Sequence, residues 1–405
     1  MTRRLAQAAS ALLACAIGGS AGAQSFDVKG YFDLRVGRSD AREDNWLEGG
    51  LAKTRFGAGD GGVTGAAAIA ADWQPTPSLF ASAEVQYVPA ARRPLDVIDA
   101  WVRWRPVSTT PWRWSAKAGM FFPPVSLEND GVGWTATRTL TPSAIDTWVG
   151  EELRVFGVEA RLEHRGARGT LAASFALFGK NDPAGELLAS RGWALHDVTS
   201  GLDGSVREPD AIAPLIGAQA PVRYRPFLEL DHRLGAYASL DWRTPADDRA
   251  VLTVYDNRAD PSREVDYAGR ELYAWRTRFW SAGVQRRVGD VVFLAQAMRG
   301  GTVIEPEPGL RFDTRFAAAY VLAAWDAGRW QPALRVDAFQ TRRSPVPLDE
   351  HGHAVTLALA WRPAEHWRLT GELLRVDSVR DQRRLAGLDP RQRELQLQAS
   401  LRWFY

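Results

Sequence analysis

The sequence is poor in cysteine, lysine and methionine. It has one Cys, Cys15, three Met, and only four lysines among its 50 basic residues. A single cysteine excludes an internal disulfide framework. The formal net charge of +2 is far from the basic excess of a nucleic-acid-binding protein. With 45% hydrophobic and 24% charged residues, the chain is not expected to be disordered.

Long apolar runs and catalytic motifs are also missing. Beyond the N-terminal segment, no apolar run reaches the ~18 residues that a membrane helix needs. There is no G-x-S-x-G, phosphate loop or H-E-x-x-H. His196-Asp197 with Ser200 is a weak candidate for a catalytic triad, because adjacent residues of an extended segment point apart. His351 and His353 lie in an expected loop. We therefore predict no enzyme activity, no cofactor and no metal.

The N-terminal segment has the features of a secretory signal. Two arginines open it, an apolar stretch follows as far as Ile17, and Ala21 and Ala23 occupy the positions of an A-x-A cleavage site. We predict a signal peptide over residues 1–23 and one mature domain over residues 24–405. Cleavage would remove the only cysteine.

Most of the remaining chain alternates between apolar and polar residues. In the segment 26–38, for example, Phe32 and Leu34 share one face, and Asp33 and Arg35 share the other. A period of two indicates β-strands with one apolar and one polar face. The sequence predicts sixteen such strands, at residues 26–38, 65–74, 78–88, 95–106, 112–120, 153–165, 169–179, 228–243, 249–257, 274–287, 291–299, 312–325, 330–341, 353–362, 367–379 and 392–405.

The predicted connections alternate in length. Short turns follow the even-numbered strands, and mostly longer loops follow the odd-numbered ones. This sorting is typical of an up-and-down transmembrane barrel, and a Greek-key sandwich has no reason to show it. Ten of the 17 tryptophans would form a ring at the turn end, where a headgroup boundary suits an indole. They are Trp73, Trp104, Trp112, Trp114, Trp242, Trp325, Trp330, Trp361, Trp367 and Trp403.

A barrel of this size is too wide for its own side chains to fill, so we expect it to enclose water. With the signal, the strand count and the ending Trp403-Phe404-Tyr405, the chain resembles the Gram-negative outer-membrane porins. That family usually ends in Phe, whereas Tyr405 stands here. The resemblance implies integral insertion in the outer membrane, a homotrimer, and recognition of the last strand by the barrel assembly machinery. Residues 118–129 resemble the strand-to-loop passage of the phosphate-selective porins.

The resemblance also implies that loop 121–152 folds into the barrel as a constriction loop. Its charged residues are Glu128, Asp130, Arg138, Asp146, Glu151 and Glu152. The alternation predicts bases on the lumen wall, among them Arg35, Arg103, Arg105, Arg113, Lys117 and Arg161. Two interpretations stay open. The loop acids and wall bases could set a transverse field that sorts solutes by charge, or they could pair and pin the loop.

The predicted lumen faces carry twelve bases, Arg315 among them, and nine acids. We therefore predict an outer-membrane porin for passive diffusion of small hydrophilic solutes or ions, with a weak anion preference. The outward strands 65–71 and 316–324 are rich in small residues and could pack against a neighbouring copy. The alternatives are a barrel enzyme and a structural or surface-binding protein, with the 180–227 loop as its recognition element.

Overall fold

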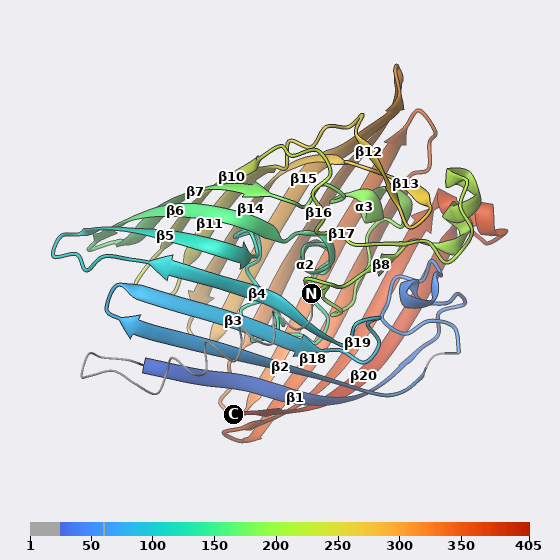
Figure 1. Ribbon diagram of the computed structural model, residues 1–405. Helices are drawn as coiled ribbons and strands as arrows, with labels where there is room; N and C mark the ends of the chain where they lie inside the picture. Colours follow the sequence, from blue (N-terminus) through green and yellow to red (C-terminus); the bar gives the residue numbers. More distant parts are fainter. Residues whose placement is uncertain (1–24, 60) are drawn as a thin grey trace.

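The computed structural model describes residues 25–59 and 61–405, so the predicted signal peptide lies outside the described residues. Sixteen strands form a closed antiparallel barrel, in which successive strands pair and the last pairs with the first (Figure 1). This confirms the predicted fold class. The barrel strands are β1 (Ser25–Ser39), β2 (Gly61–Thr76), β3 (Leu79–Tyr87), β4 (Leu95–Trp104), β5 (Trp112–Phe121), β6 (Val155–Gly166), β7 (Gly169–Gly179), β10 (Gly235–Arg243), β11 (Arg249–Asp256), β14 (Arg276–Val288), β15 (Val291–Glu307), β16 (Leu310–Trp325), β17 (Trp330–Ser344), β18 (Glu350–Ala364), β19 (Trp367–Arg380) and β20 (Arg391–Phe404).

The two faces of each strand are oriented as the alternation predicts. On β1, Phe32 and Leu34 face outward and are 53% and 56% exposed, while Asp33 and Arg35 face inward and are buried. Large apolar side chains cover the outside of most other strands as well. Such a surface suits hydrocarbon, and closure of the barrel pairs the backbone groups that lipid could not satisfy.

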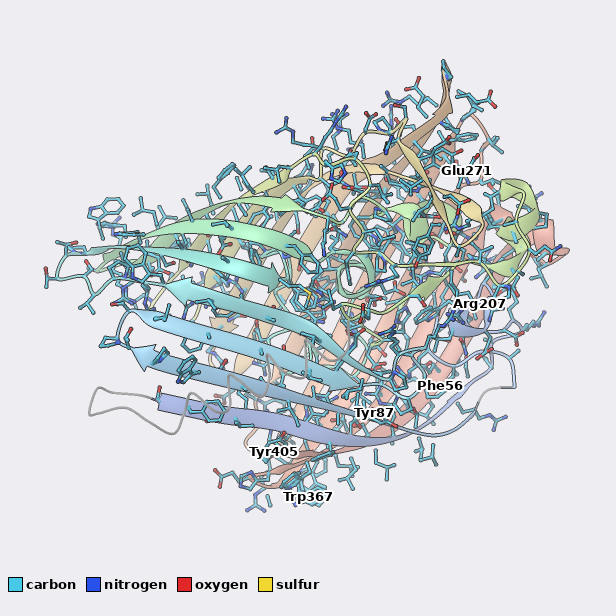
Figure 2. The ribbon with its side chains drawn as sticks, in the orientation of Figure 1. Phe56, Tyr87, Arg207, Glu271, Trp367 and Tyr405 are labelled. Carbon is cyan, nitrogen blue, oxygen red and sulfur yellow. The ribbon has the colours of Figure 1, made fainter. Side chains whose placement is uncertain are left out.

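The two ends of the barrel differ, and we call them the turn end and the loop end. Most tryptophans of the predicted ring are exposed beside the turns, including Trp325 and Trp330. Trp367 and Tyr405 lie near each other at this end, and Glu271 lies at the other (Figure 2). No helix within the described residues is long and apolar enough to cross a membrane.

Two details differ from the predicted loops. Residues 300–311 do not form a loop, because β15 and β16 continue as a long hairpin that is closed by Pro308 and Gly309. Gly309 has φ +85°, which a glycine adopts without strain. His351 lies on strand β18, not in a loop, and is exposed on its outward face.

The long connections contain short elements. The segment before β6 carries α2 (Ala144–Glu152), whose first turn is capped by Ser143 Oγ accepting from Asp146 N. Inside the barrel, Trp148 of α2 packs against Phe279 and Phe316, with ring centroids 5.6 and 5.1 Å apart. The other short elements are η2 (Trp46–Glu48), α3 (Glu186–Ser190), β8 (Val206–Arg207), η3 (Asp210–Ile216), β9 (Arg223–Tyr224), β12 (Glu264–Tyr267), β13 (Arg270–Tyr273) and η4 (Asp381–Ala386).

The largest cluster of buried apolar side chains therefore lies partly within the lumen, where α2 meets the wall. The number of strands alone predicts a wide aqueous interior. In the structure the interior is partly filled, because segments that fold inward place side chains where those of the wall do not reach.

Replacing Leu357 by Arg tests the assignment of the outer surface to lipid. Leu357 is 49% exposed on β18, roughly midway between the two ends of the apolar band. A cation at this depth in a bilayer is expected to lower the free energy of unfolding by about 2–4 kcal/mol. Urea unfolding in lipid vesicles measures it, with Leu357→Ala as the control. A loss under about 0.5 kcal/mol, as on a water-exposed surface, contradicts the assignment.

Candidate functional site

The lumen holds two in-folded segments. The first of them, residues 122–154, contains the predicted constriction loop 121–152 except for Phe121, which ends β5. Arg335 on β17 lies 3.2 Å from Glu128 and donates to Thr141 O at 2.7 Å. Glu372 on β19 accepts from Thr141 N at 3.1 Å. All of these side chains are buried. Arg335 and Glu372 on the far wall therefore bind the first inner segment, through its backbone and through Glu128.

The second inner segment comprises residues 180–234. Arg191 makes two hydrogen bonds to Glu151 of α2, at 2.7 and 2.6 Å. Trp193 N donates to Glu350 on β18 at 3.0 Å, and Asp197 lies 2.6 Å from Arg35 on β1. Most of this segment up to residue 200 is buried. The alternative that used 180–227 as a recognition loop is wrong for this buried part.

Residues 44–58, between β1 and β2, complete the filling near the loop end. Lys53 Nζ donates to Trp193 O at 2.7 Å and pairs with Glu350. The backbone N–H groups of Lys53 and Thr54 donate to Glu394 on β20. The segment thus joins the second inner segment to two wall strands.

Glu152 has a structural role at the junction of the two inner segments. It accepts hydrogen bonds from Trp148 Nε1 at 2.5 Å, from Tyr224 Oη at 2.6 Å and from the backbone N–H of Leu187 at 3.1 Å. Asp146 is buried beside Glu128 in the first inner segment, and burial raises the pKa of its carboxyl well above the usual range. Neither acid faces an open lumen.

The charges around Glu151 stabilise the junction between the two inner segments. Burial alone would raise the pKa of this carboxyl, but Arg191 and His196 outweigh burial and lower the pKa to about 2. Burial lowers the pKa of His196. His196 Nδ1 accepts from Val198 N, which leaves the ring proton on Nε2, 3.0 Å from Glu151.

This geometry explains why His196, Asp197 and Ser200 form no triad. His196 contacts Glu151, whereas Asp197 pairs with Arg35 and with Arg55 at 2.7 Å. Within the described chain, one group of three metal-ligand side chains lies close together. Its members are Asp182, Glu229 and Asp231. Each of these carboxylates accepts a backbone N–H, from Leu230, Lys180 and Asp260 respectively.

The remaining charges of the constriction loop lie outside this buried network. Asp130 is exposed, and Arg138 reaches Asp326, at the turn after β16. Among the acids of the constriction loop, Asp130 is thus exposed and the others are buried. Pairing with a wall arginine holds for Glu128 alone, through Arg335. Glu151 and Glu152 instead connect the two inner segments, through Arg191 and Tyr224.

The predicted wall bases also divide into two groups. Lys117 lies 3.2 Å from Glu159, and Arg161 donates to Glu163 at 2.9 Å, so these two bases and Arg35 are neutralised. Three others have no carboxylate within 4.0 Å among the residues that the structure describes. They are Arg103, Arg105 and Arg113, at the turn end of β4 and β5.

One predicted lumen base is misplaced. Arg315 faces outward from β16, with 80% of its side chain exposed. Its inward neighbours on the strand are Thr314 and Phe316, which are buried. The prediction was wrong because both faces of β16 are apolar: the inward face carries Phe316, which packs against Trp148 of the first inner segment, so alternation alone does not identify the lumen side.

Replacing Glu151 by Gln tests the junction between the inner segments. Removing one partner of a buried ion pair costs about 3–5 kcal/mol, because Arg191 is left uncompensated. We expect amide hydrogen exchange in residues 186–198 to become about 100-fold faster at pH 7. Glu163→Gln, in a partly exposed wall pair, is the matched control and should change exchange little. Equal exchange in both variants would contradict the role of this pair.

The low pKa of Glu151 also predicts a pH dependence. Because its folded-state pKa lies below the ordinary value, the ion pair stabilises docking above about pH 4.5, and this contribution is lost as pH falls toward about 2. Hydrogen exchange of residues 186–198, corrected for intrinsic rates, should accelerate over this window. The Glu151→Gln variant should lack this step, and a step of equal size in it would point to another group.

No protein-family model matches the chain, and no curated protein sequence matches it. Its structure is similar to those of outer-membrane proteins. The loop L8 deletion mutant of OmpT from Vibrio cholerae has a TM-score of 0.53 and 11% identity, over 95% of this chain and 100% of that one. The channel DcaP of Acinetobacter baumannii has a TM-score of 0.56 and 10% identity, over 96% and 99%. Salmonella typhi OmpF has a TM-score of 0.51 and 10% identity, over 94% and 97%.

At this identity the similarity shows the fold alone, and it does not show the resemblance of residues 118–129 to the phosphate-selective porins. By its architecture, the chain is a closed sixteen-stranded antiparallel barrel with the fold of these outer-membrane proteins.

Proposed function

We propose that the chain forms a narrow channel through which small hydrophilic solutes diffuse passively across the outer membrane, with a weak preference for anions. The observation that carries the proposal is a closed barrel with an apolar outer wall and a charged, hydrogen-bonding inner wall. An interior of this kind offers polar partners to a hydrated solute. The gradient of the solute supplies the driving force.

The inner segments support a narrow channel over a wide one. Residues 122–154 and 180–200 occupy much of the lumen and are tied to β1, β17, β18 and β19 by buried ion pairs and hydrogen bonds. Water and solute must pass beside them. The proposed conductance is therefore well below that of an empty sixteen-stranded barrel.

The charges that stay free support the preference for anions. The loop acids Glu128, Glu151 and Glu152 are engaged with protein donors. Arg103, Arg105 and Arg113 have no carboxylate partner among the described residues, so they can attract an anion at the turn end. The exposed Asp130 opposes them, and the preference is accordingly weak.

We also propose that the chain assembles as a homotrimer through the side of the barrel that contains β2. The outward face of β2 is shallow at Gly65, Ala67 and Ala71, and Ile69, 44% exposed, projects between the two alanines. OmpT of Vibrio cholerae, whose structure is similar with a TM-score of 0.52, was solved in a trimer form. The signal peptide over residues 1–23 and recognition by the barrel assembly machinery remain proposals.

Recording in a planar bilayer tests the proposed function. The purified protein should give stable conductance steps, and a KCl gradient should give a reversal potential on the anion side. The triple variant R103Q/R105Q/R113Q should lower the chloride-to-potassium permeability ratio about twofold, because it removes the free positive charge. Arg286→Gln, which lies on the outer wall with 72% of its side chain exposed, is the matched control. The absence of conductance steps refutes the proposed channel. An unchanged chloride-to-potassium permeability ratio in the triple variant refutes the role of these bases.

A further inference from the structure

The outer wall of the barrel carries a basic cleft at the loop end of β14, β15 and β16. These three strands lie side by side in the barrel (Figure 1). Its volume is about 880 Å³. The strand register places Arg278 opposite Gly301, and Gly301 opposite Arg315. Arg299 is the next outward residue of β15 toward the turn end. Two arginines therefore flank a glycine, and a third lies one outward position away; Asp313 Oδ1 lies 3.9 Å from the point that a Cβ on Gly301 would occupy.

The positive charge of this basic cleft is only partly neutralised. Asp256 pairs with Arg276 at 3.1 Å. Asp313 is shared between two arginines, at 3.8 and 4.0 Å. Arg278 and Arg299 have no carboxylate within 4.0 Å in the part of the chain that the structure describes. The cleft thus retains cations without protein counterions.

A comparison with β19 and β20 shows that this arrangement is not general around the barrel. Outward arginines also occur at the loop end of those strands, but Asp377 contacts Arg391 at 3.1 Å and Arg393 at 2.9 Å. There the chain supplies its own anion. Among the described residues no carboxylate does the same for Arg278 and Arg299, which leaves these two arginines available to an anion from outside the protein.

An apolar cleft of about 570 Å³ adjoins the basic cleft toward the turn end. Ala282 follows Trp280 as the next outward residue of β14, and Ala297 follows Arg299 in the same way on β15. The small alanines leave a groove between larger neighbours. Its outward lining includes Leu240, Trp242, Leu252, Val284, Ala295, Ala319 and Val321.

The height of the basic cleft matches the outer boundary of a membrane. On β16, Arg315 lies ten residues from Trp325 of the turn-end ring. At a rise of about 3.3 Å per residue and a tilt of about 40°, this separation spans about 25 Å along the barrel axis, the thickness of the apolar band. The arginines therefore lie at headgroup level, and the apolar cleft lies at the level of acyl chains.

We propose that these two clefts bind a phosphate-bearing lipid of the outer leaflet, with a phosphate between Arg278, Arg299 and Arg315 and an acyl chain in the apolar cleft. Guanidinium groups bind phosphate through paired, charge-assisted hydrogen bonds. Basic pockets on membrane proteins recognise anionic lipid headgroups in the same way. A soluble anion would use the basic cleft alone, whereas a lipid uses both.

Native mass spectrometry of the full barrel in detergent tests the proposal. The probes are diphosphorylated lipid A, the same lipid with its phosphates removed, and inorganic phosphate. The triple variant R278Q/R299Q/R315Q should bind diphosphorylated lipid A at least about tenfold more weakly than the wild type. Arg286→Gln is the matched control, because it lies outward on β14 at the turn end and is 72% exposed. It should bind as the wild type does.

Heat-modifiable mobility in a gel reports whether each variant is folded. If the triple variant does not fold, the single variant Arg299→Gln should still bind diphosphorylated lipid A more weakly than Arg286→Gln. The proposal is overturned by equal lipid binding in the arginine variants and the control. It is also overturned if removing the lipid phosphates changes nothing, or if inorganic phosphate displaces the lipid completely. Loss of an oligomer without loss of lipid would assign the face to a second copy of the chain.

Discussion

The closed ladder of backbone hydrogen bonds is the constraint on which the rest of this structure depends. A strand that crosses hydrocarbon must pair both of its edges, and only the contact between β1 and β20 removes the last free edge. Once the sheet is closed, every strand has one side toward lipid and one toward the lumen. The alternation of apolar and polar residues is the direct consequence, and the depth of the apolar band sets the length of the strands.

A second constraint acts on the interior of the barrel. Sixteen strands enclose more space than their own side chains can fill, so the loops that fold inward determine what remains open. Here the chain anchors them with buried charges: Arg335 holds the first inner segment, and Arg35 and Glu350 hold the second. A buried charge without its partner is costly, and each pair therefore favours one position of its segment. These contacts specify the conformation of the inner segments.

The inner and outer surfaces of the barrel wall differ in which charged side chains lack a partner of opposite charge. Inside, Glu128, Glu151 and Glu152 are bound by protein donors, whereas the bases near the turn end of β4 and β5 have no carboxylate partner among the described residues. Outside, Asp377 neutralises Arg391 and Arg393, whereas Arg278 and Arg299 have no such partner in the part of the chain that the structure describes. In both places, we propose that a cation without a carboxylate partner binds an external anion. Apolar surface beside it distinguishes a lipid from a solute.

The sequence by itself determined the barrel. The period of two, the sorting of connections by length and the tryptophans beside the turns are local signals, and they predicted all sixteen barrel strands. The largest errors are at β10, predicted to begin seven residues too early, and at β15, predicted to end eight residues too early. Only the tertiary structure decided how the interior is filled. Glu151 meets Arg191, and Asp197 meets Arg35, across 40 and more than 100 residues. No local pattern encodes such a pairing, because it depends on where closure places each strand around the barrel. For the same reason, the face on which Arg315 lies and the buried position of residues 180–200 could be read only from the folded chain.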